Sequence, residues 1–473
     1  MPNTNSAFEI VVRGWNADPS ERSDLGPTSA EITINVGRFC ATEVEDITAK
    51  TVRNTVRVSA MLLATWLLDN WWRLRWEPFR QLDLPKERLL DWEFSHSLPS
   101  VGAGYVWPPV TLASDGANIL VTCIAGAGDE YPDLVPIRYL NSFSERVPAA
   151  DFEATVGAFV EAVIARLDSN GLRHTVLHEL WRETNDERKQ PSQGFRRRLE
   201  ALLGLDPDSD AQLVSALISN WTGRIGQDAL AEVAAATDAV RIVGMLSKAE
   251  EVSESTSMFA DTYDIDDLRE SLAGMSKTMD QPWVLGRYAA YKLRDRWGFG
   301  FGAITTAAFA DRLKLPLHAL EDVYVSAPFS LGVGGFSESK MKFILKRPHE
   351  QSRRFDIARL IGDRLAANSN DIWHPATKGY TFRQKVQRAF AAELLCPSEE
   401  LVRRFDAPIE LDGIDDVVAE TAKEYCVSDR LVLTHLVNRG LAPDFLLEES
   451  DVTSYREFLS RMAVARSLTT FVS

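Results

Sequence analysis

Two helical stretches near the carboxyl end decide the fold of this chain. They read RFDIARLIGDRL at residues 354–365 and FRQKVQRAFAAELLCP at residues 382–397. In the first stretch, apolar residues from Phe355 to Leu365 recur at helical spacing and share one face. The second stretch ends at Pro397, which cannot continue a helix. Both stretches are therefore predicted to be helices that pack against a common core.

Shorter elements surround this helix pair. Residues 341–346 are predicted to form a strand before it, and residues 414–425 and 428–438 to form two helices after it. Ser428 suits the N-cap of the last helix, because its hydroxyl can accept a hydrogen bond from a first-turn amide. Gly440 suits the C-terminal stop. These signals predict a compact domain with one strand and four helices.

The sequence of this domain resembles the ImmA/IrrE metallopeptidase family, which has a zincin-like fold. The resemblance is carried by RFDIARLIGDRL at 354–365, RAFAAELLCP at 388–397 and VSDRLVLTHLVNRGL at 427–441. It implies that the first helix should bear the motif HExxH. In that motif two histidines bind zinc, and the glutamate is the general base for the metal-bound water. A carboxylate from the next helix is the third protein ligand.

The motif is lost in this chain. The aligned positions hold Arg359, Leu360, Ile361, Gly362 and Asp363 in place of His, Glu, x, x and His. Arginine offers no lone pair to a metal, and leucine cannot deprotonate water. One remaining carboxylate is too few, because catalytic zinc takes three protein ligands. The resemblance therefore implies a pseudo-peptidase with no catalytic residues, no metal site and no cofactor.

The third ligand is missing as well. No Asp or Glu occurs between Ile372 and Ala392, and Gln384 stands near its place. We expect the old substrate cleft to be kept as a binding groove between the two helices and the 341–346 strand. That strand is expected to be an edge that accepts an extended peptide by backbone pairing. The predicted groove residues are Arg359, Leu360, Asp363, Gln384 and Arg388.

Two alternatives stay open. In the first, His374 with Asp363 and Asp371 forms a rearranged zinc site, and the chain is a metallo-endopeptidase. In the second, residues 414–440 form a helix-turn-helix of a DNA-binding transcriptional regulator. Its second helix would contact DNA through Arg430, Asn438 and Arg439. The expected partner is a protein or peptide, with nucleic acid as the alternative.

The rest of the chain predicts an α+β protein that is mainly α. Strands are expected at 8–13, 31–37, 118–124 and 136–140, and a long tryptophan-rich helix over 46–76. A flexible connection is expected at 248–262 and a glycine-rich loop at 330–336. The predicted organisation is a mixed α+β domain at 1–148, a helical region at 149–280, a helical connector at 281–330, the zincin-like domain at 331–448 and a C-terminal helix or tail at 449–473.

Composition sets limits on function. Of the 473 residues, 45% are hydrophobic and 25% charged, which excludes fibrous and disordered classes. The net charge of −16 argues against broad binding to nucleic acid or to an anionic membrane. The longest apolar run, 58–68, is half the length of a spanning helix. Four scattered cysteines fit a reducing compartment, so we expect a cytoplasmic protein with no membrane partner.

Overall fold

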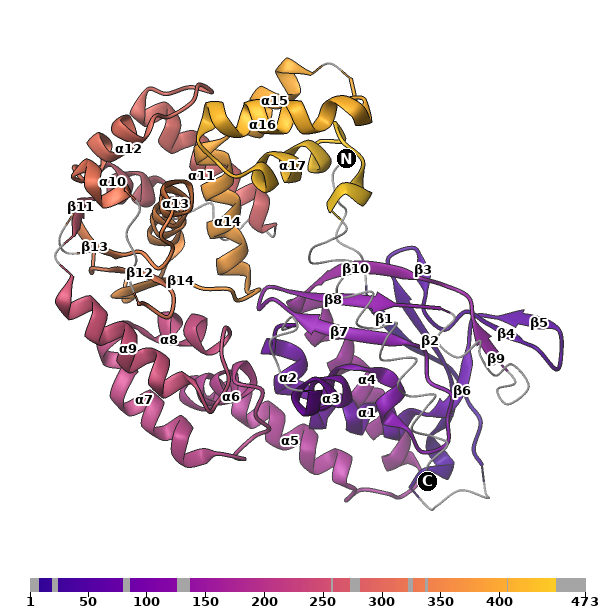
Figure 1. The fold of residues 1–473 in the computed structure, drawn as a ribbon. Helices are drawn as coiled ribbons and strands as arrows, with labels where there is room; N and C mark the ends of the chain where they lie inside the picture. The colour runs from indigo at the N-terminus through magenta and orange to yellow at the C-terminus, as the bar shows by residue number, and fades with distance from the viewer. Residues whose placement is uncertain are drawn as a thin grey trace. The chain divides into compact units, whose positions relative to one another are not determined.

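The computed structural model describes residues 8–18, 24–79, 86–125, 137–256, 258–272, 281–321, 326–336, 339–405 and 407–447 (Figure 1). The predicted segment 449–473 lies outside them. The chain forms two compact units, the first ending at Ala211 and the second beginning at Gln212. The predicted helical region 149–280 is therefore divided between both units. Helices predominate, and the α+β, mainly α class is confirmed.

The first unit combines antiparallel sheets with helices. One sheet has the order β1-β2-β3, with β6 also paired to β2; the other two have the orders β10-β8-β7 and β5-β4-β9. Its elements are β1 (Phe8–Trp15), η1 (Gly26–Thr28), β2 (Ser29–Val36), β3 (Phe39–Cys40), β4 (Val44–Asp46), β5 (Thr51–Arg53), β6 (Val56–Ser59), α1 (Ala60–Asp69), α2 (Trp71–Trp76), α3 (Lys86–His96), η2 (Leu98–Val101), β7 (Val110–Ser114), β8 (Asn118–Cys123), β9 (Ile137–Tyr139), β10 (Phe143–Pro148), α4 (Ala149–Ser169), α5 (Val176–Lys189) and α6 (Pro191–Leu202).

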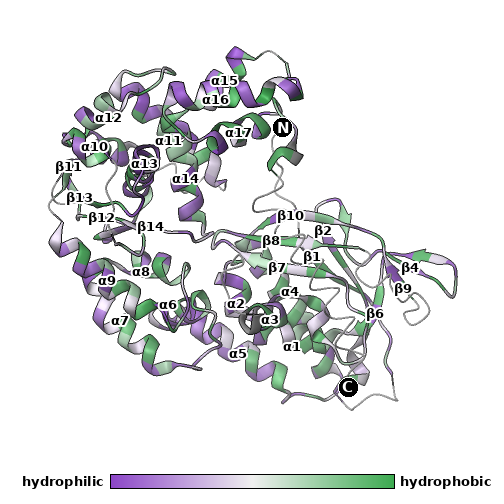
Figure 2. Cartoon of the chain, in the orientation of Figure 1, coloured by the Kyte–Doolittle hydropathy of each residue, from purple (hydrophilic) through white to green (hydrophobic). Residues whose placement is uncertain are grey.

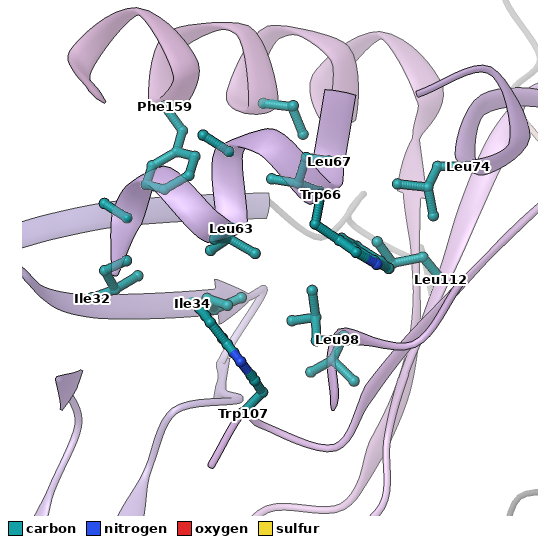
Figure 3. Close-up of a cluster of buried hydrophobic side chains, with 14 of the residues drawn as sticks. Ile32, Ile34, Leu63, Trp66, Leu67, Leu74, Leu98, Trp107, Leu112 and Phe159 are labelled. Carbon is teal, nitrogen blue, oxygen red and sulfur yellow. The ribbon is translucent and has the colours of Figure 1, made fainter. Parts of the chain in front are cut away.

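The predicted helix over 46–76 is wrong in its first half. Residues 46–59 form the end of β4 and the strands β5 and β6, because their β-branched residues favour extended backbone. The helix starts at Ala60, where the Ser59 hydroxyl accepts a hydrogen bond from Leu62 N. Trp66 and its neighbours pack into the core of this unit (Figure 3). Most of the tryptophan-rich stretch is therefore buried in the core, Trp66, Trp71 and Trp72 included.

The second unit is built on one four-stranded antiparallel sheet of order β11-β13-β12-β14. Its helices and strands are α7 (Ala211–Ile225), α8 (Gln227–Ala234), α9 (Ile242–Ser255), β11 (Phe259–Asp261), α10 (Tyr263–Leu272), α11 (Pro282–Trp297), α12 (Thr306–Arg312), η3 (Leu317–Leu320), β12 (Ser330–Val333), β13 (Lys340–Ile344), α13 (Glu350–Ala366), β14 (Trp373–Ala376), α14 (Phe382–Leu395), α15 (Ser398–Arg404), η4 (Leu411–Gly413), α16 (Ile414–Tyr425), α17 (Asp429–Asn438) and η5 (Asp444–Leu447).

Two predicted irregular segments of this unit are regular. The expected connection at 248–262 is the end of α9 followed by β11, and the glycine-rich stretch at 330–336 contains β12. Gly332 serves close packing within the sheet, not a bend. A Cβ atom there would lie 2.7 Å from Met341 Sδ and 3.3 Å from His374 Cβ. Glycine therefore fills a strand position whose neighbours leave no room for a side chain.

The two helices that decide the fold are present and tightly packed. Helix α13 crosses α14 at Gly362, where a Cβ atom would lie 2.7 Å from the ring of Phe390. Ser428 caps α17 through a hydrogen bond from Leu431 N, and Gly440 has a positive φ of 70° after that helix.

Among the described residues, every helix is too short or too polar to span a lipid bilayer.

Candidate functional site

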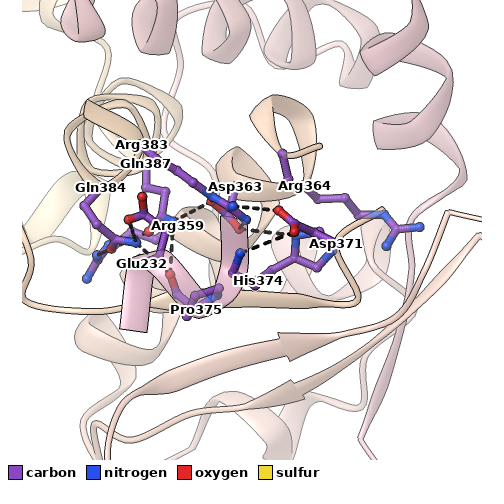
Figure 4. Close-up of polar contacts among 12 residues, drawn as sticks. Glu232, Arg359, Asp363, Arg364, Asp371, His374, Pro375, Arg383, Gln384 and Gln387 are labelled. Atoms are coloured by element: carbon purple, nitrogen blue, oxygen red, sulfur yellow. Dashed lines mark hydrogen bonds and ion pairs between the residues drawn. The ribbon is translucent and has the colours of Figure 1, made fainter. Parts of the chain in front are cut away.

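A buried polar cluster lies where α13, α14, β14 and α8 meet in the second unit (Figure 4). The hydropathy colouring shows polar residues within α13 and α14 next to apolar ones (Figure 2). Burial without hydrogen bonds would cost several kcal/mol for each charged group. The members of this cluster therefore have to satisfy one another, and their contacts define what the site can do.

Arg383 is the centre of the cluster. Its Nε donates to Asp363 Oδ1 and its Nη2 to Asp363 Oδ2, both at 2.6 Å. Its Nη1 donates to Asp371 Oδ2 at 2.7 Å. Burial alone would raise the pKa of the Asp363 carboxyl, but the charge and hydrogen bonds of Arg383 hold it well below its usual value. Asp363 is therefore ionised and has its two oxygens engaged by one guanidinium.

His374 contacts the same carboxylate from β14. Its Nδ1 lies 3.2 Å from Asp363 Oδ2, and its Nε2 lies 3.3 Å from the carbonyl oxygen of Gly334. Both neighbours are hydrogen-bond acceptors, so each ring nitrogen faces a protein oxygen and not an open position for a metal ion. In this arrangement His374 is a hydrogen-bond donor.

Arg359 takes the position where the resemblance implies the first zinc-binding histidine. Its Nη2 donates to the carbonyl oxygen of Thr377 and to Gln384 Oε1, both at 2.7 Å, and to Gln387 Oε1 at 3.2 Å. Among the described residues, its buried Nε has no hydrogen-bond partner. Burial, and then the positive charge of Arg388, lowers the pKa of Arg359 to about 9. The three oxygen atoms that accept hydrogen bonds from its Nη2 belong to uncharged groups.

Two glutamines cover the outer backbone of β14. Gln384 Nε2 and Gln387 Nε2 donate to the carbonyl oxygen of Pro375 at 2.9 and 3.1 Å. Gln384 Oε1 also accepts from the amide of Thr377 at 2.9 Å. Gln384 Nε2 reaches Glu232 of α8 at 3.0 Å. Side chains therefore use the hydrogen-bonding groups that an incoming peptide strand would need at these positions.

These contacts correct the predicted groove. Leu360, Asp363 and Gln384 are fully buried and Arg359 is 3% exposed, so these four line no open groove. Arg388 is half-buried and donates to the carbonyl oxygen of Gly379. The prediction that the strand at 341–346 is an edge strand is also wrong. Strand β13 lies inside the sheet, paired with β11 on one side and with β12 on the other.

The residues present do not fit a zinc ion. Asp363, Asp371 and His374, the predicted rearranged set, do come together, but Arg383 lies between the two carboxylates. Zinc prefers neutral imidazole, thiolate and carboxylate ligands, and a guanidinium in their midst opposes a second cation. Within the described ranges, no group of three or more His, Cys, Asp or Glu residues is placed to hold a metal.

Of the predicted DNA-contacting residues, Arg430 and Asn438 lie on α17, and Arg439 follows it directly. Arg430 and Asn438 are exposed. Arg439 instead donates to the Ser398 hydroxyl at 2.6 Å and to Glu399 Oε1 at 3.0 Å, so it is held against α15. The neighbouring α16 exposes Asp415, Asp416 and Glu420, among other residues. Acidic side chains beside α17 disfavour the approach of a phosphate backbone.

Several residues of the polar cluster are not among the site residues predicted from the sequence. Gln387 was detectable, because it lies with Gln384 on the buried face of a helix that was correctly predicted, and Arg383 lies one turn before Gln387. Glu232 gave no signal, since it lies about 150 residues upstream and its carboxyl accepts from Thr381 Oγ1 at 2.6 Å only after folding. Polar residues on a predicted buried face are thus a usable sign of an internal network.

Comparisons with known proteins found no matching family model, no matching curated protein and no matching solved structure. They neither support nor oppose the resemblance to ImmA/IrrE metallopeptidases. The function of the site is therefore argued from the chemistry of its residues.

Proposed function

We propose that the chain is a non-catalytic ImmA/IrrE-like protein that binds a partner protein or peptide. Its setting would be bacterial stress, mobile-element or phage-defence regulation in the cytoplasm. The resemblance of 354–365, 388–397 and 427–441 to that family supports the scaffold. Cys40, Cys123, Cys396 and Cys426 are free thiols, which agrees with a reducing compartment.

One observation carries the proposal: Arg383 places its positive charge against Asp363, the residue that the resemblance aligns with the second zinc-binding histidine. Its guanidinium binds Asp363 and Asp371, and Asp363 also accepts from His374. The groups that could have ligated a metal are thereby used to neutralise an arginine. The two carboxylates that Arg383 binds are not free to activate water, so the scaffold is proposed to act by recognition.

The recognition would not use the old substrate cleft. Gln384 and Gln387 occupy the outer backbone of β14, and α8 lies against the same strand through Glu232. An extended peptide cannot pair with backbone groups that are already bonded to side chains. The binding surface is therefore proposed to lie on the exterior of the second unit, with the closed cluster as its rigid support.

Zinc titration of the full chain tests the non-catalytic part. Isothermal titration calorimetry with zinc chloride should show no saturable binding, and metal analysis after dialysis should find no stoichiometric zinc. Incubation with unfolded casein should give no chelator-sensitive cleavage. One zinc per chain that is lost in both Asp363→Asn and His374→Ala would overturn the proposal in favour of a rearranged metallopeptidase.

A further inference from the structure

An open cavity lies beside β11, the edge strand of the second unit's sheet that is opposite β14 (Figure 1). Its volume is about 660 Å³, and ligand pockets commonly measure about 300–1,000 Å³. The chain after α12 covers part of the outer side of β11, since Asp261 N donates to the carbonyl oxygen of Leu313 at 2.9 Å. The cavity lies between this segment, the first turn of α10, the end of α11 and the start of β13. The width of the sheet separates it from the buried polar cluster at β14.

Three exposed cations line this cavity, namely Arg312, Lys314 and Lys340. Lys340 pairs with Asp261 across the two strands, and Lys314 Nζ donates to Asp261 Oδ2. Arg312 Nη2 donates to the carbonyl oxygen of Trp297, a neutral group, at 2.7 Å. An ammonium group carries three N–H donors and a guanidinium five. Each of the three side chains therefore has N–H groups left for a ligand after the contacts that the described residues make.

The two carboxylates of the cavity wall already accept hydrogen bonds at each oxygen. Asp261, bound to one lysine through Oδ2, accepts from Tyr263 N at its Oδ1 at 2.9 Å. Hydrogen bonds, first from that lysine and then from this amide, hold the pKa of Asp261 below its ordinary value. Asp264 Oδ1 accepts from Arg296 Nε and its Oδ2 from Trp297 Nε1, both at 3.2 Å. The wall thus offers a ligand donors more than acceptors, which favours an anion.

An aromatic side chain lies among these charges. Tyr263 is 63% exposed, whereas Trp297, the other aromatic residue of the wall, is 1% exposed. A flat ring placed against Tyr263 would remove apolar surface from water, and aromatic pairs gain further from stacked or edge-to-face contact. The cavity therefore combines an aromatic face with charged donors, which suits a ligand that has both a ring and an anionic group.

The charge of the wall favours a carboxylate over a phosphate. Among the described residues that line the cavity, three cations stand against two carboxylates, an excess of one positive charge. One carboxylate balances this excess. A phosphate monoester carries about 1.5 to 2 negative charges at pH 7, so Asp261 and Asp264 would repel it more strongly.

We propose that this cavity binds a small aromatic carboxylate, with Arg312 and Lys340 as donors to the carboxylate and the Tyr263 ring against the ring of the ligand. The site goes beyond the proposed function, because it shares no residue with the closed polar cluster. A free aromatic acid and the C-terminal phenylalanine of a peptide both have this chemistry, and the experiment below separates the two sources.

Isothermal titration calorimetry of the full chain tests this proposal. The probe N-acetyl-L-phenylalanine should bind saturably, and its uncharged amide and N-acetyl-L-alanine should each bind at least about tenfold more weakly. Phenyl phosphate, a dianion at pH 8, should also bind more weakly than N-acetyl-L-phenylalanine. The peptide acetyl-Gly-Gly-Ser-Phe separates the sources: tighter binding than that of N-acetyl-L-phenylalanine assigns the site to a peptide C-terminus, and weaker binding assigns it to a free acid.

Substitutions locate the binding site. Arg312→Gln with Lys340→Gln should weaken N-acetyl-L-phenylalanine at least about tenfold, and Lys340→Gln alone should give a smaller loss. The matched control is Lys50→Gln with Arg53→Gln, an exposed lysine and arginine of the first unit, which should leave the affinity unchanged.

Tyr263→Ala tests the aromatic contact separately from the charges. It should reduce the ratio between the affinities for N-acetyl-L-phenylalanine and N-acetyl-L-alanine at least about threefold, because the ligand's ring loses the ring it packs against. A ratio equal to that of the parent chain would exclude Tyr263 from the site.

Three further results would overturn the proposal: no saturable binding of N-acetyl-L-phenylalanine, equal affinities in the cavity and control variants, or tighter binding of the amide or of phenyl phosphate. Circular dichroism of each variant should match the parent chain, and Lys340→Gln keeps the test valid if the double variant does not fold. Failure here differs from failure of the non-catalytic proposal, which depends on zinc binding and proteolysis at Asp363 and His374.

Discussion

Each unit of the chain buries a histidine between a carboxylate and a backbone carbonyl. In the first unit, His96 Nδ1 lies 2.7 Å from the carbonyl oxygen of Leu112, and its Nε2 lies 3.1 Å from Glu77 Oε2. Arg73 Nε donates to the same Glu77 oxygen at 2.7 Å. In the second unit His374, Asp363 and Arg383 have the corresponding roles. The same combination of imidazole, carboxylate and guanidinium thus recurs on unrelated elements.

The two clusters differ in how exposed to water the other carboxylate partners of their arginines are. The remaining nitrogens of Arg73 bind Asp91 and Asp206, whose side chains are 44% and 65% exposed. Arg383 instead binds Asp371, which is 1% exposed. Charges interact more strongly where water is excluded, and an unpaired charge costs more there. The comparison predicts that the second cluster is the more sensitive to loss of its arginine.

The largest effect is expected for Arg383→Met. The change removes the cation but keeps much of its volume, and it leaves Asp363 and Asp371 buried without their arginine partner. The second unit should lose about 3–5 kcal/mol of stability. Hydrogen exchange read by mass spectrometry, peptide by peptide over α13 and β14, measures this loss separately from the first unit.

The matched control is Arg53→Met, which removes an arginine paired at 3.9 Å with Asp46 near the surface of the first unit. It should change stability by less than about 0.5 kcal/mol. Equal protection of α13 peptides in the parent chain and Arg383→Met would show that Arg383 is dispensable, and the contrast between the clusters would disappear.

How much of the fold and of the candidate site can be predicted from the sequence depends on how far apart in the chain the contacting residues are. The helices 354–365 and 382–397 were predictable because their apolar period is local. The prediction of a helix over residues 46–59 is wrong because this polar stretch directly precedes an apolar helix and resembles its continuation. The predicted groove beside an edge strand is wrong for another reason. The pairing of β11 with β13 joins residues about 80 positions apart, and no local sequence pattern encodes it.

Acid should weaken the first cluster over a defined range. Burial alone would raise the pKa of Glu77, but Arg73 and His96 outweigh it and lower the pKa from 4.5 to about 2. A carboxyl with a depressed folded pKa stabilises the fold above its unfolded pKa, and that stability is lost as pH falls through the folded value. Stability from Glu77 should therefore decline between pH 4.5 and 2, by about 3 kcal/mol.

Urea denaturation at pH 6 and pH 3, followed by hydrogen exchange of α2 and β7 peptides, measures this decline. The parent chain should lose protection at the lower pH more steeply than Glu77→Gln, which has no carboxyl to titrate at this position. Identical pH profiles for the two proteins would show that Glu77 does not couple protonation to folding.

At neutral pH, Glu77→Gln should cost about 2 kcal/mol, less than the loss of Arg383. Arg73 keeps Asp91 and Asp206, and water reaches those carboxylates, so its charge stays compensated. The amide of glutamine can still accept from one of the two donors, Arg73 or His96. A loss larger than that of Arg383→Met would reverse the order expected from solvent exposure.

The smallest effect is expected for Glu232→Gln in the second cluster. Burial raises the pKa of Glu232 despite the nearby charge of Arg383 and the hydrogen bonds from Thr381 and Gln384. A raised folded pKa means that this carboxyl stabilises the fold less as pH rises through that value. Glutamine keeps an acceptor oxygen for Thr381 and Gln384 but carries no charge to desolvate.

At pH 8 the free energy of unfolding of Glu232→Gln should lie within about 1 kcal/mol of that of the parent chain, and it should change less between pH 5 and 8. Loss of more than about 2 kcal/mol would mean that the cluster needs all three carboxylates, and that Arg383 is balanced by Glu232 as well as by Asp363 and Asp371.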